Sequence, residues 1–417
     1  MPYRLTTLAC ALTCALAPAY VVRWHIAFYP TTLLEVAIVL SVILFAVEWW
    51  RTDRAFTWRS PFVLPTLMFL LAGAISVVTA PSLTAGLGLY RAYLLEPIAF
   101  GLVLTNVVRT TSRALLVVGG LAVGSAIAGL ANSVVVLSGL LHHTYSVTDT
   151  PPVVIYSTAN AVALYAIPVL ALALSLALYG NNQVERVGGA FFAVIGTIVA
   201  AMSFSRGGYL ALAAVVLAAV ILHRRRLLMI GLAVVALVAL GLIPPIRHRI
   251  LIETQNVYGN TVQSRIDLWT AAVKLLEHRP IFGAGLSGFQ ARAAPYYTHI
   301  HTAANFIDPH NIVLNFWVET GVLGLIAFAW IMVVAFRVSW QGWRQGPSAW
   351  RPYHLGVCLA LVAIVVHGLV DVPYFKNDLS LQFWTLIGLT WAGWHWSAAA
   401  SSPSSQQLTR AAGIRVQ

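Results

Sequence analysis

Apolar stretches long enough to cross a lipid bilayer follow one another along almost the whole of this sequence. A helix needs about 20 apolar residues to cross the hydrocarbon core. Backbone polar groups inside lipid must be satisfied within the segment, so runs this long are helices, and the alternating pattern of barrel strands is absent. The sequence therefore predicts an all-α polytopic membrane protein.

Composition supports this prediction and excludes a soluble globular fold. Of the 417 residues, 59% are hydrophobic and only 9% are charged, whereas about a quarter of a soluble domain is charged. The expected spans, about twelve, cover residues 5–22, 30–49, 61–80, 91–107, 114–139, 153–179, 187–203, 207–222, 227–245, 310–337, 353–371 and 378–397. We expect residues 1–400 to form one transmembrane domain and residues 401–417 to form a disordered cytoplasmic tail.

The distribution of Lys and Arg predicts the orientation, because short cytoplasmic loops retain positive charge. With the N-terminus inside, the cytoplasmic side holds Arg51, Arg54, Arg59, Arg109, Arg113, Arg186, Arg224, Arg225, Arg226, Arg337, Arg344, Arg351, Arg410 and Arg415. The opposite short loops hold only Arg23, Arg91, Arg206 and Lys376. Both termini are therefore expected in the cytoplasm. The formal net charge of +12 then needs no nucleic-acid partner.

One external loop, residues 246–309, is far longer than the others. Within it, residues 264–278 show helical spacing of apolar residues, and the expected apolar face consists of Ile266, Trp269, Ala272, Val273 and Leu276. We expect an amphipathic helix lying on or near the outer membrane face. The three cysteines, Cys10, Cys14 and Cys358, lie inside spans and indicate neither a disulfide framework nor a metal site.

Three polar motifs at the outer face are candidates for chemistry. In Ser203-Phe204-Ser205-Arg206-Gly207-Gly208-Tyr209, an arginine beside two glycines at a helix start suits a phosphate; the alternative is a tight turn with a snorkelling arginine. Arg265 opens the loop helix after Ser264, where it binds an anion or is merely solvated. In Asp308-Pro309-His310-Asn311, the imidazole can serve as a general base, although a lone histidine is more often structural.

The segments SFSRGGYLAL, SRIDLWTAAVKLLEHRPIFGAGLSGF and DPHNIVLNFWVETGVLGL, in this order around one long external loop, resemble the O-antigen ligase and polymerase family. RAYLLEPIAF and HGLVDVPYFKNDLSLQFW look like further stretches of its members. The resemblance implies a GT-C-like glycosyltransferase of the bacterial inner membrane whose active site faces the periplasm. Such enzymes move sugar, with inversion, from undecaprenyl pyrophosphate to an acceptor hydroxyl, without a metal or other cofactor.

Carried over residue by residue, the resemblance implies that Arg206 and Arg265 handle the pyrophosphate and that His310 is catalytic. We expect Tyr209, Asp308 and Asn311, from the same motifs, to contact substrate. Two further pairs of residues are open to two interpretations. Arg91 with Glu96, and Asp371 with His367, either line the same cavity or form structural pairs.

The acceptor distinguishes the functions that the sequence leaves open. A ligase adds the glycan to lipid A core, a polymerase adds it to another lipid-linked glycan, and some relatives use a protein such as pilin. A transporter or flippase of lipid-linked sugars also fits twelve spans. The off-centre position of the long loop, the lack of evident repeats and the gathering of candidates at one face argue against transport.

Overall fold

The computed structural model describes residues 3–27, 29–52, 56–145, 151–223, 225–244, 247, 261–297 and 306–400. The helices are α1 (Arg4–Ala15), η1 (Ala17–Val21), α2 (Leu33–Thr52), α3 (Val63–Val78), α4 (Leu83–Tyr90), η2 (Arg91–Leu95), α5 (Glu96–Val107), α6 (Thr111–Leu141), α7 (Ala159–Tyr179), α8 (Gln183–Met202), α9 (Arg206–Leu222), α10 (Arg226–Leu242), α12 (Thr261–His278), α13 (Phe289–Ala293), η4 (Ala294–Tyr296), α14 (Ile312–Gln345), α15 (Arg351–Gly368) and α16 (Asn377–Ala400). The expected tail, 401–417, lies outside the described residues, as does part of the long loop.

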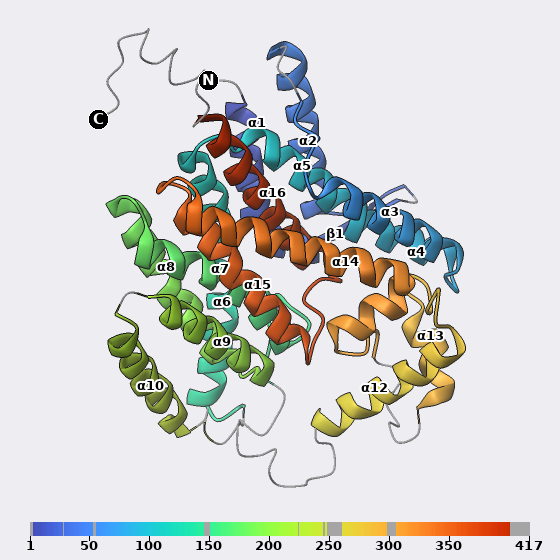
Figure 1. Cartoon of the computed structure of the whole chain (residues 1–417). Coiled ribbons are helices and arrows are strands. Elements are labelled where there is room, and N and C mark those ends of the chain that lie inside the picture. The colour runs from blue at the N-terminus through green and yellow to red at the C-terminus, as the bar shows by residue number, and fades with distance from the viewer. Residues whose placement is uncertain are drawn as a thin grey trace.

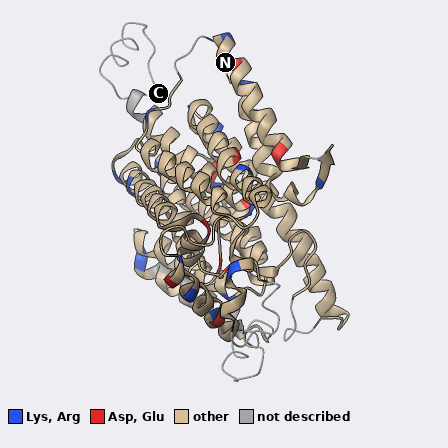
Figure 2. Cartoon of the chain, turned by 90° about the vertical axis from the view of Figure 1, so that its right-hand side faces the viewer, with Lys and Arg blue, Asp and Glu red and all other residues tan. Residues whose placement is uncertain are grey.

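Long apolar helices dominate the part of the chain that the structure describes (Figure 1). Seven segments there are long and apolar enough to cross a membrane: Leu33–Thr52, Leu83–Val107, Thr111–Leu141, Ala159–Tyr179, Gln183–Met202, Ile312–Gln345 and Arg351–Gly368. Three shorter apolar helices, α1, α3 and α9, accompany them. Charged residues are sparse along the helices (Figure 2). The predicted all-α polytopic membrane fold is confirmed, and twelve spans remain a prediction.

Helices α7 and α15 form the centre of the bundle. In the apolar 18-residue stretches of these two helices, 83% and 78% of the residues are buried, compared with 28% for the peripheral α2. Small residues bring the two helices close: a Cβ added at Gly356 would lie 3.0 Å from the Leu172 side chain. The Ser175 hydroxyl donates to the Pro352 carbonyl at 2.6 Å. Peripheral helices expose many leucines and valines, as expected where lipid is the solvent.

A short antiparallel hairpin departs from the expected all-helical architecture. Strand β1 (Arg23–Ile26) pairs with β2 (Tyr29–Thr32), with Arg23 opposite Thr32. The hairpin lies between α1 and α2. It is anchored by Glu35 in the first turn of α2, whose carboxylate accepts from the Tyr29 and Thr31 hydroxyls.

Helix α12 lies at the end of the molecule opposite α1 (Figure 1). It begins at Thr261, three residues before the expected start, so Ser264 does not cap it. Its buried face agrees with the predicted one only in part, because Ala272 and Leu276 are buried whereas Ile266 and Val273 are 45% and 46% exposed. The buried side chains are Leu268, Ala271, Ala272, Leu275 and Leu276, which pack with Phe289 and Val318. The helix thus docks on the bundle through one apolar face and exposes a second.

Helix α14 is interrupted at Gly321, which adopts φ 67° and ψ −179°. The interruption frees backbone groups that the loop segment 279–289 satisfies. The Ala284 amide donates to the Val318 carbonyl at 2.7 Å, and the Val322 amide donates to the Ile281 carbonyl at 3.0 Å. Irregular backbone inside a membrane-spanning helix is tolerated only where other parts of the protein cover it. The 279–289 segment is therefore an integral part of the bundle.

Candidate functional site

The turn before α9 places Arg206 at the first position of that helix. Ser205 caps the helix by accepting from the Gly208 amide at 3.1 Å, and Phe204 adopts a left-handed conformation with φ 48°. The absence of a side chain at Gly207 is required here, because a Cβ would lie 2.9 Å from both His367 Cδ2 and Val370 Cγ2. The start of α9 therefore packs directly on the end of α15 and on residue 370.

Arg265 reaches the same place from α12. Its Nε donates to the Val370 carbonyl at 2.8 Å, across 105 residues of sequence. Burial lowers the pKa of the half-buried Arg265 guanidinium, and the charge of Asp371 partly opposes that effect. The guanidinium is thus fixed by one backbone contact and lies beside an acidic side chain.

His310 forms a pair with Asp308. The His310 amide donates to Asp308 Oδ1 at 2.8 Å, and His310 Nδ1 lies 2.5 Å from the same oxygen. An ionised carboxylate can only accept, so Nδ1 carries the proton and Nε2 is left as an acceptor. The His310 side chain is 27% exposed and that of Asp308 is 20% exposed. This arrangement suits a general base held in one tautomer.

The two partners shift each other's pKa in the expected directions. Burial alone would raise the pKa of Asp308, but hydrogen bonds and the charge of His310 outweigh it and lower this pKa. Burial would likewise lower the pKa of His310, yet the hydrogen bond and charge of Asp308 raise it, with a contribution from Asp371. Arg265 acts on His310 in the opposite direction. The pair therefore lies within electrostatic range of Arg265 and Asp371.

The backbone at His310 is constrained from its C-terminal side. His310 has φ 51°, a sparsely populated conformation for a residue other than glycine. Asn311 caps α14 by accepting from the Val313 and Leu314 amides, and its Nδ2 donates to the Leu369 carbonyl at 3.0 Å. Asn311 therefore ties the histidine to the segment that also holds Arg265.

Residues 369–371, which we name the connecting segment, join all three motifs. It contacts Gly207 beside Arg206, accepts from Arg265 and accepts from Asn311 beside His310. Asp371 at its end is only 7% exposed and accepts from the Val372 amide at 2.9 Å. The structure thus assembles two arginines, a histidine–aspartate pair and a further carboxylate around one short stretch of backbone.

Residues 191–329, about a third of the chain, match the sequence model of a family described as O-antigen ligase. Over this region the chain is therefore similar to O-antigen ligases. The matched region contains Arg206, Arg265 and His310, whereas Arg91, Glu96 and Asp371 lie outside it. A search of curated proteins finds no match. This similarity agrees with an enzyme of the glycosyltransferase kind.

Arg91 and Glu96 belong to a cluster of their own. Arg91 lies 3.0 Å from Glu96 and 3.2 Å from Glu35, donates to the Pro30 carbonyl at 3.2 Å and stacks over the Tyr29 ring at 4.5 Å. These contacts tie η2 to the hairpin. This geometry favours a structural ion pair between Arg91 and Glu96 over a role in lining the substrate cavity.

The Tyr209 side chain makes its contacts within the turn between α8 and α9. Its hydroxyl donates to the Ala201 carbonyl at 2.8 Å, and its ring packs against the cluster of Val136, Tyr145 and Phe204. This bond closes the turn between α8 and α9. Tyr209 therefore supports the position of Arg206, and its contact with substrate remains a prediction.

Three further charged residues, one in the Arg91 cluster and two close to the site, are not among the residues that the sequence motifs predict. Glu35 is the second carboxylate at Arg91. Glu319 is 4% exposed and accepts from the Ser287 amide at 2.6 Å and from the Phe289 amide at 3.4 Å. Lys376 acts electrostatically on Asp308. A lone acid inside an apolar run, as at Glu35 and Glu319, was the signal available in the sequence.

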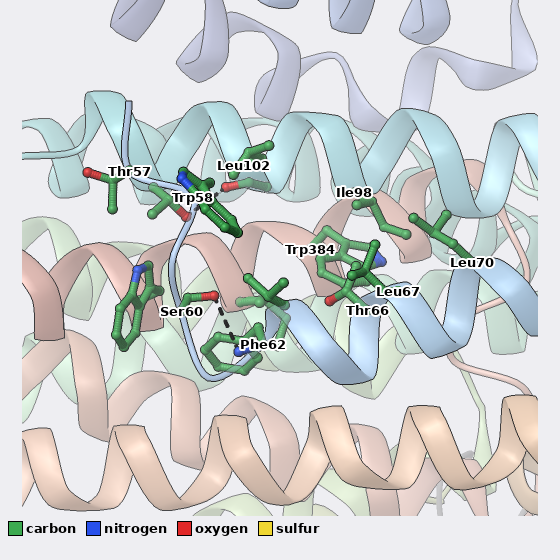
Figure 3. A pocket seen from close by; sticks show the side chains of 15 residues that line it. Thr57, Trp58, Ser60, Phe62, Thr66, Leu67, Leu70, Ile98, Leu102 and Trp384 are labelled. Carbon is green, nitrogen blue, oxygen red and sulfur yellow. Dashed lines mark hydrogen bonds between the residues drawn. The ribbon is translucent and has the colours of Figure 1, made fainter. Parts of the chain in front are cut away.

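A cavity of about 250 Å³ lies elsewhere, between α3, α5 and α16 (Figure 3). Trp58, Trp384 and Trp391 are among its lining residues, and no charged side chain is among the part of the lining that the structure describes. Ser60 closes one end by accepting from the Phe62 amide at 3.3 Å. With no group to handle pyrophosphate or a proton, this cavity is not the reaction site.

Proposed function

We propose that the protein transfers a glycan from undecaprenyl pyrophosphate to an acceptor hydroxyl on the periplasmic face, as an O-antigen ligase acting on lipid A core. The observation that carries this proposal is the joining of Arg206, Arg265 and the His310–Asp308 pair by the connecting segment. The reaction needs positive groups for a pyrophosphate and a base for a hydroxyl. These side chains supply both.

The proposed step is a direct displacement at the anomeric carbon. His310 Nε2 takes the proton of the acceptor hydroxyl while its oxygen forms the new glycosidic bond. The bond between the anomeric carbon and the pyrophosphate oxygen breaks, and undecaprenyl pyrophosphate leaves. Arg206 and Arg265 stabilise the charge that grows on the leaving group, and one such interaction contributes on the order of 3 kcal/mol to lowering the barrier.

A polymerase would use the same donor and the same residues, with a second lipid-linked glycan as the acceptor. The acceptor that is consumed separates the two reactions. The test is a reconstituted assay with an undecaprenyl pyrophosphate-linked glycan, offered either lipid A core or further lipid-linked glycan, with chelator present. Transfer to lipid A core under chelation is the expected result.

His310→Ala should lower the transfer rate by about 10²–10⁴-fold, because the general base is removed. His278→Ala is the matched control, since His278 is an exposed histidine at the end of α12, bonded to the Lys274 carbonyl. It should retain the wild-type rate. Full transfer by a folded His310→Ala variant would refute the catalytic assignment. Movement of intact lipid-linked glycan across the bilayer, with no bond changed, would favour a transporter.

A further inference from the structure

A second, larger cavity lies at the opposite end of the bundle from the connecting segment. It occupies about 1110 Å³ where α7 and α14 end and where α8 and α15 begin. Arg186, Arg225, Arg344 and Arg351 line it, together with apolar and aromatic side chains such as Leu222 and Trp343. The charge pattern of the sequence assigns all four arginines to the cytoplasmic side.

No aspartate or glutamate is among the described residues that line this cavity. The nearby Glu185 is 2% exposed and is occupied in the bundle, where it accepts from the Asn181 amide at 2.6 Å and from the Tyr353 hydroxyl at 2.9 Å. The four guanidinium groups come from three parts of the chain, since Arg344 and Arg351 flank the single connection between α14 and α15. The fold therefore brings together positive charge that no lining carboxylate neutralises.

Two of the arginines are oriented by the backbone. Arg186 Nε donates to the Gly180 carbonyl at 2.7 Å, and Arg351 Nε donates to the Gly346 carbonyl at 2.8 Å. Arg344 stacks on Trp343 at 5.8 Å. Within the described part of the chain, no hydrogen bond or ion pair occupies the Nη atoms of these three. A planar guanidinium fixed through Nε presents its other donors in the fork that matches a phosphate.

We propose that this cavity binds the head group of an anionic phospholipid in the adjacent leaflet, with the phosphates held by the four arginines. Basic pockets between helix ends at the cytoplasmic side recognise such head groups. The apolar side chains in the wall suit the glycerol and the first carbons of the acyl chains. Four arginines in a cavity of about 1110 Å³ favour a head group with two phosphates, as in cardiolipin, over one with a single phosphate.

The test measures thermal unfolding of the purified full chain in detergent during titration with cardiolipin, phosphatidylglycerol or phosphatidylcholine. A lipid that binds the folded state raises the unfolding midpoint. The test variant is Arg225→Gln with Arg344→Gln, because neither side chain holds a backbone carbonyl among the described bonds. The control is Arg51→Gln with Arg59→Gln, two exposed arginines expected on the same side, one in the last turn of α2 and one before α3.

Cardiolipin should raise the wild-type midpoint at the lowest concentration, phosphatidylglycerol at a higher one, and phosphatidylcholine should have no effect. The cavity variant should need about 25-fold more cardiolipin, at about fivefold for each arginine, while the control should respond as wild type. An equal loss in both variants would show only general attraction and would overturn the site. An equal midpoint rise with inorganic pyrophosphate alone would overturn the assignment to a lipid. Midpoints without lipid show whether each variant folds.

Discussion

The two ends of the bundle each gather arginines, and they hold them in different ways. At the end that holds the connecting segment, Arg206 and Arg265 are half-buried, and Arg265 is fixed on the Val370 carbonyl near Asp371. At the other end, Arg186 and Arg344 are exposed in an open cavity that no acid lines. Backbone carbonyls fix arginines at both ends, so burial is the difference, and a partly dehydrated guanidinium suits charge that develops during a reaction. An exposed one suits a lasting charge such as a lipid phosphate.

The strongest test of this contrast compares one arginine from each end. Arg265→Gln should lower the rate of glycan transfer by about 10²–10³-fold, because one fixed donor to the growing charge is lost. Arg344→Gln should leave the rate within about twofold, since exposed charges contribute little at a distance. The reconstituted assay with lipid-linked donor measures both. Equal losses in the two variants would remove the proposed difference between the ends.

The His310–Asp308 pair predicts how the rate depends on pH. The base form of His310 is required, and Asp308 raises its pKa, so the wild-type rate should rise with pH through a midpoint above the ordinary histidine value of about 6.5. In Asp308→Asn the burial remains while the carboxylate is gone, so the midpoint should move to lower pH and the plateau should fall roughly tenfold. Rate profiles of both proteins measure this. Asp267→Asn, in α12, is the control, and an unmoved midpoint in Asp308→Asn would contradict the pairing.

Gly207→Ala should give the smallest of these effects on activity. The added Cβ would meet His367 and Val370 at 2.9 Å, and overpacking of this kind costs about 1–3 kcal/mol. We expect a lower unfolding midpoint and a rate reduced severalfold, because Arg206 shifts with its helix. Gly188→Ala, in α8, is the matched control, as a Cβ there meets nothing within 4 Å. A Gly207→Ala variant with unchanged midpoint and rate would show that the contact is loose.

The all-α membrane fold could be predicted from the sequence because a long apolar run by itself indicates a segment that lies in lipid. The length of a run and its lack of charge need no knowledge of neighbouring helices. Helical spacing alone predicts only part of the face that α12 buries, namely Ala272 and Leu276. Ile266 and Val273 satisfy the helical period as well as Leu268 and Leu275 do, and only the neighbours Phe289 and Val318 decide which pair is covered.

The candidate site was predictable as a set of residue types at one face, and its assembly was not. The sequence indicates an anion-binding arginine in two motifs and a base in a third. It carries no sign that backbone carbonyls at 369 and 370 join them, because any residue supplies a carbonyl. The second carboxylate at Arg91 was missed for a related reason, since Glu35 lies 56 positions away in the sequence and its proximity depends on the hairpin.

The interruption of α14 at Gly321 has a consequence for any chimera with a relative. The 279–289 segment supplies hydrogen-bond partners to the backbone of this helix on both sides of Gly321. A swap of the whole of residues 246–309 would therefore leave an amide and a carbonyl of α14 without partners inside the protein. Transplants meant to change the acceptor should therefore keep that stretch and graft only the flanking parts around 243–260 and 298–305. The long loop looks freely exchangeable in the sequence, yet residues 279–289 within it hold α14 together and must be kept.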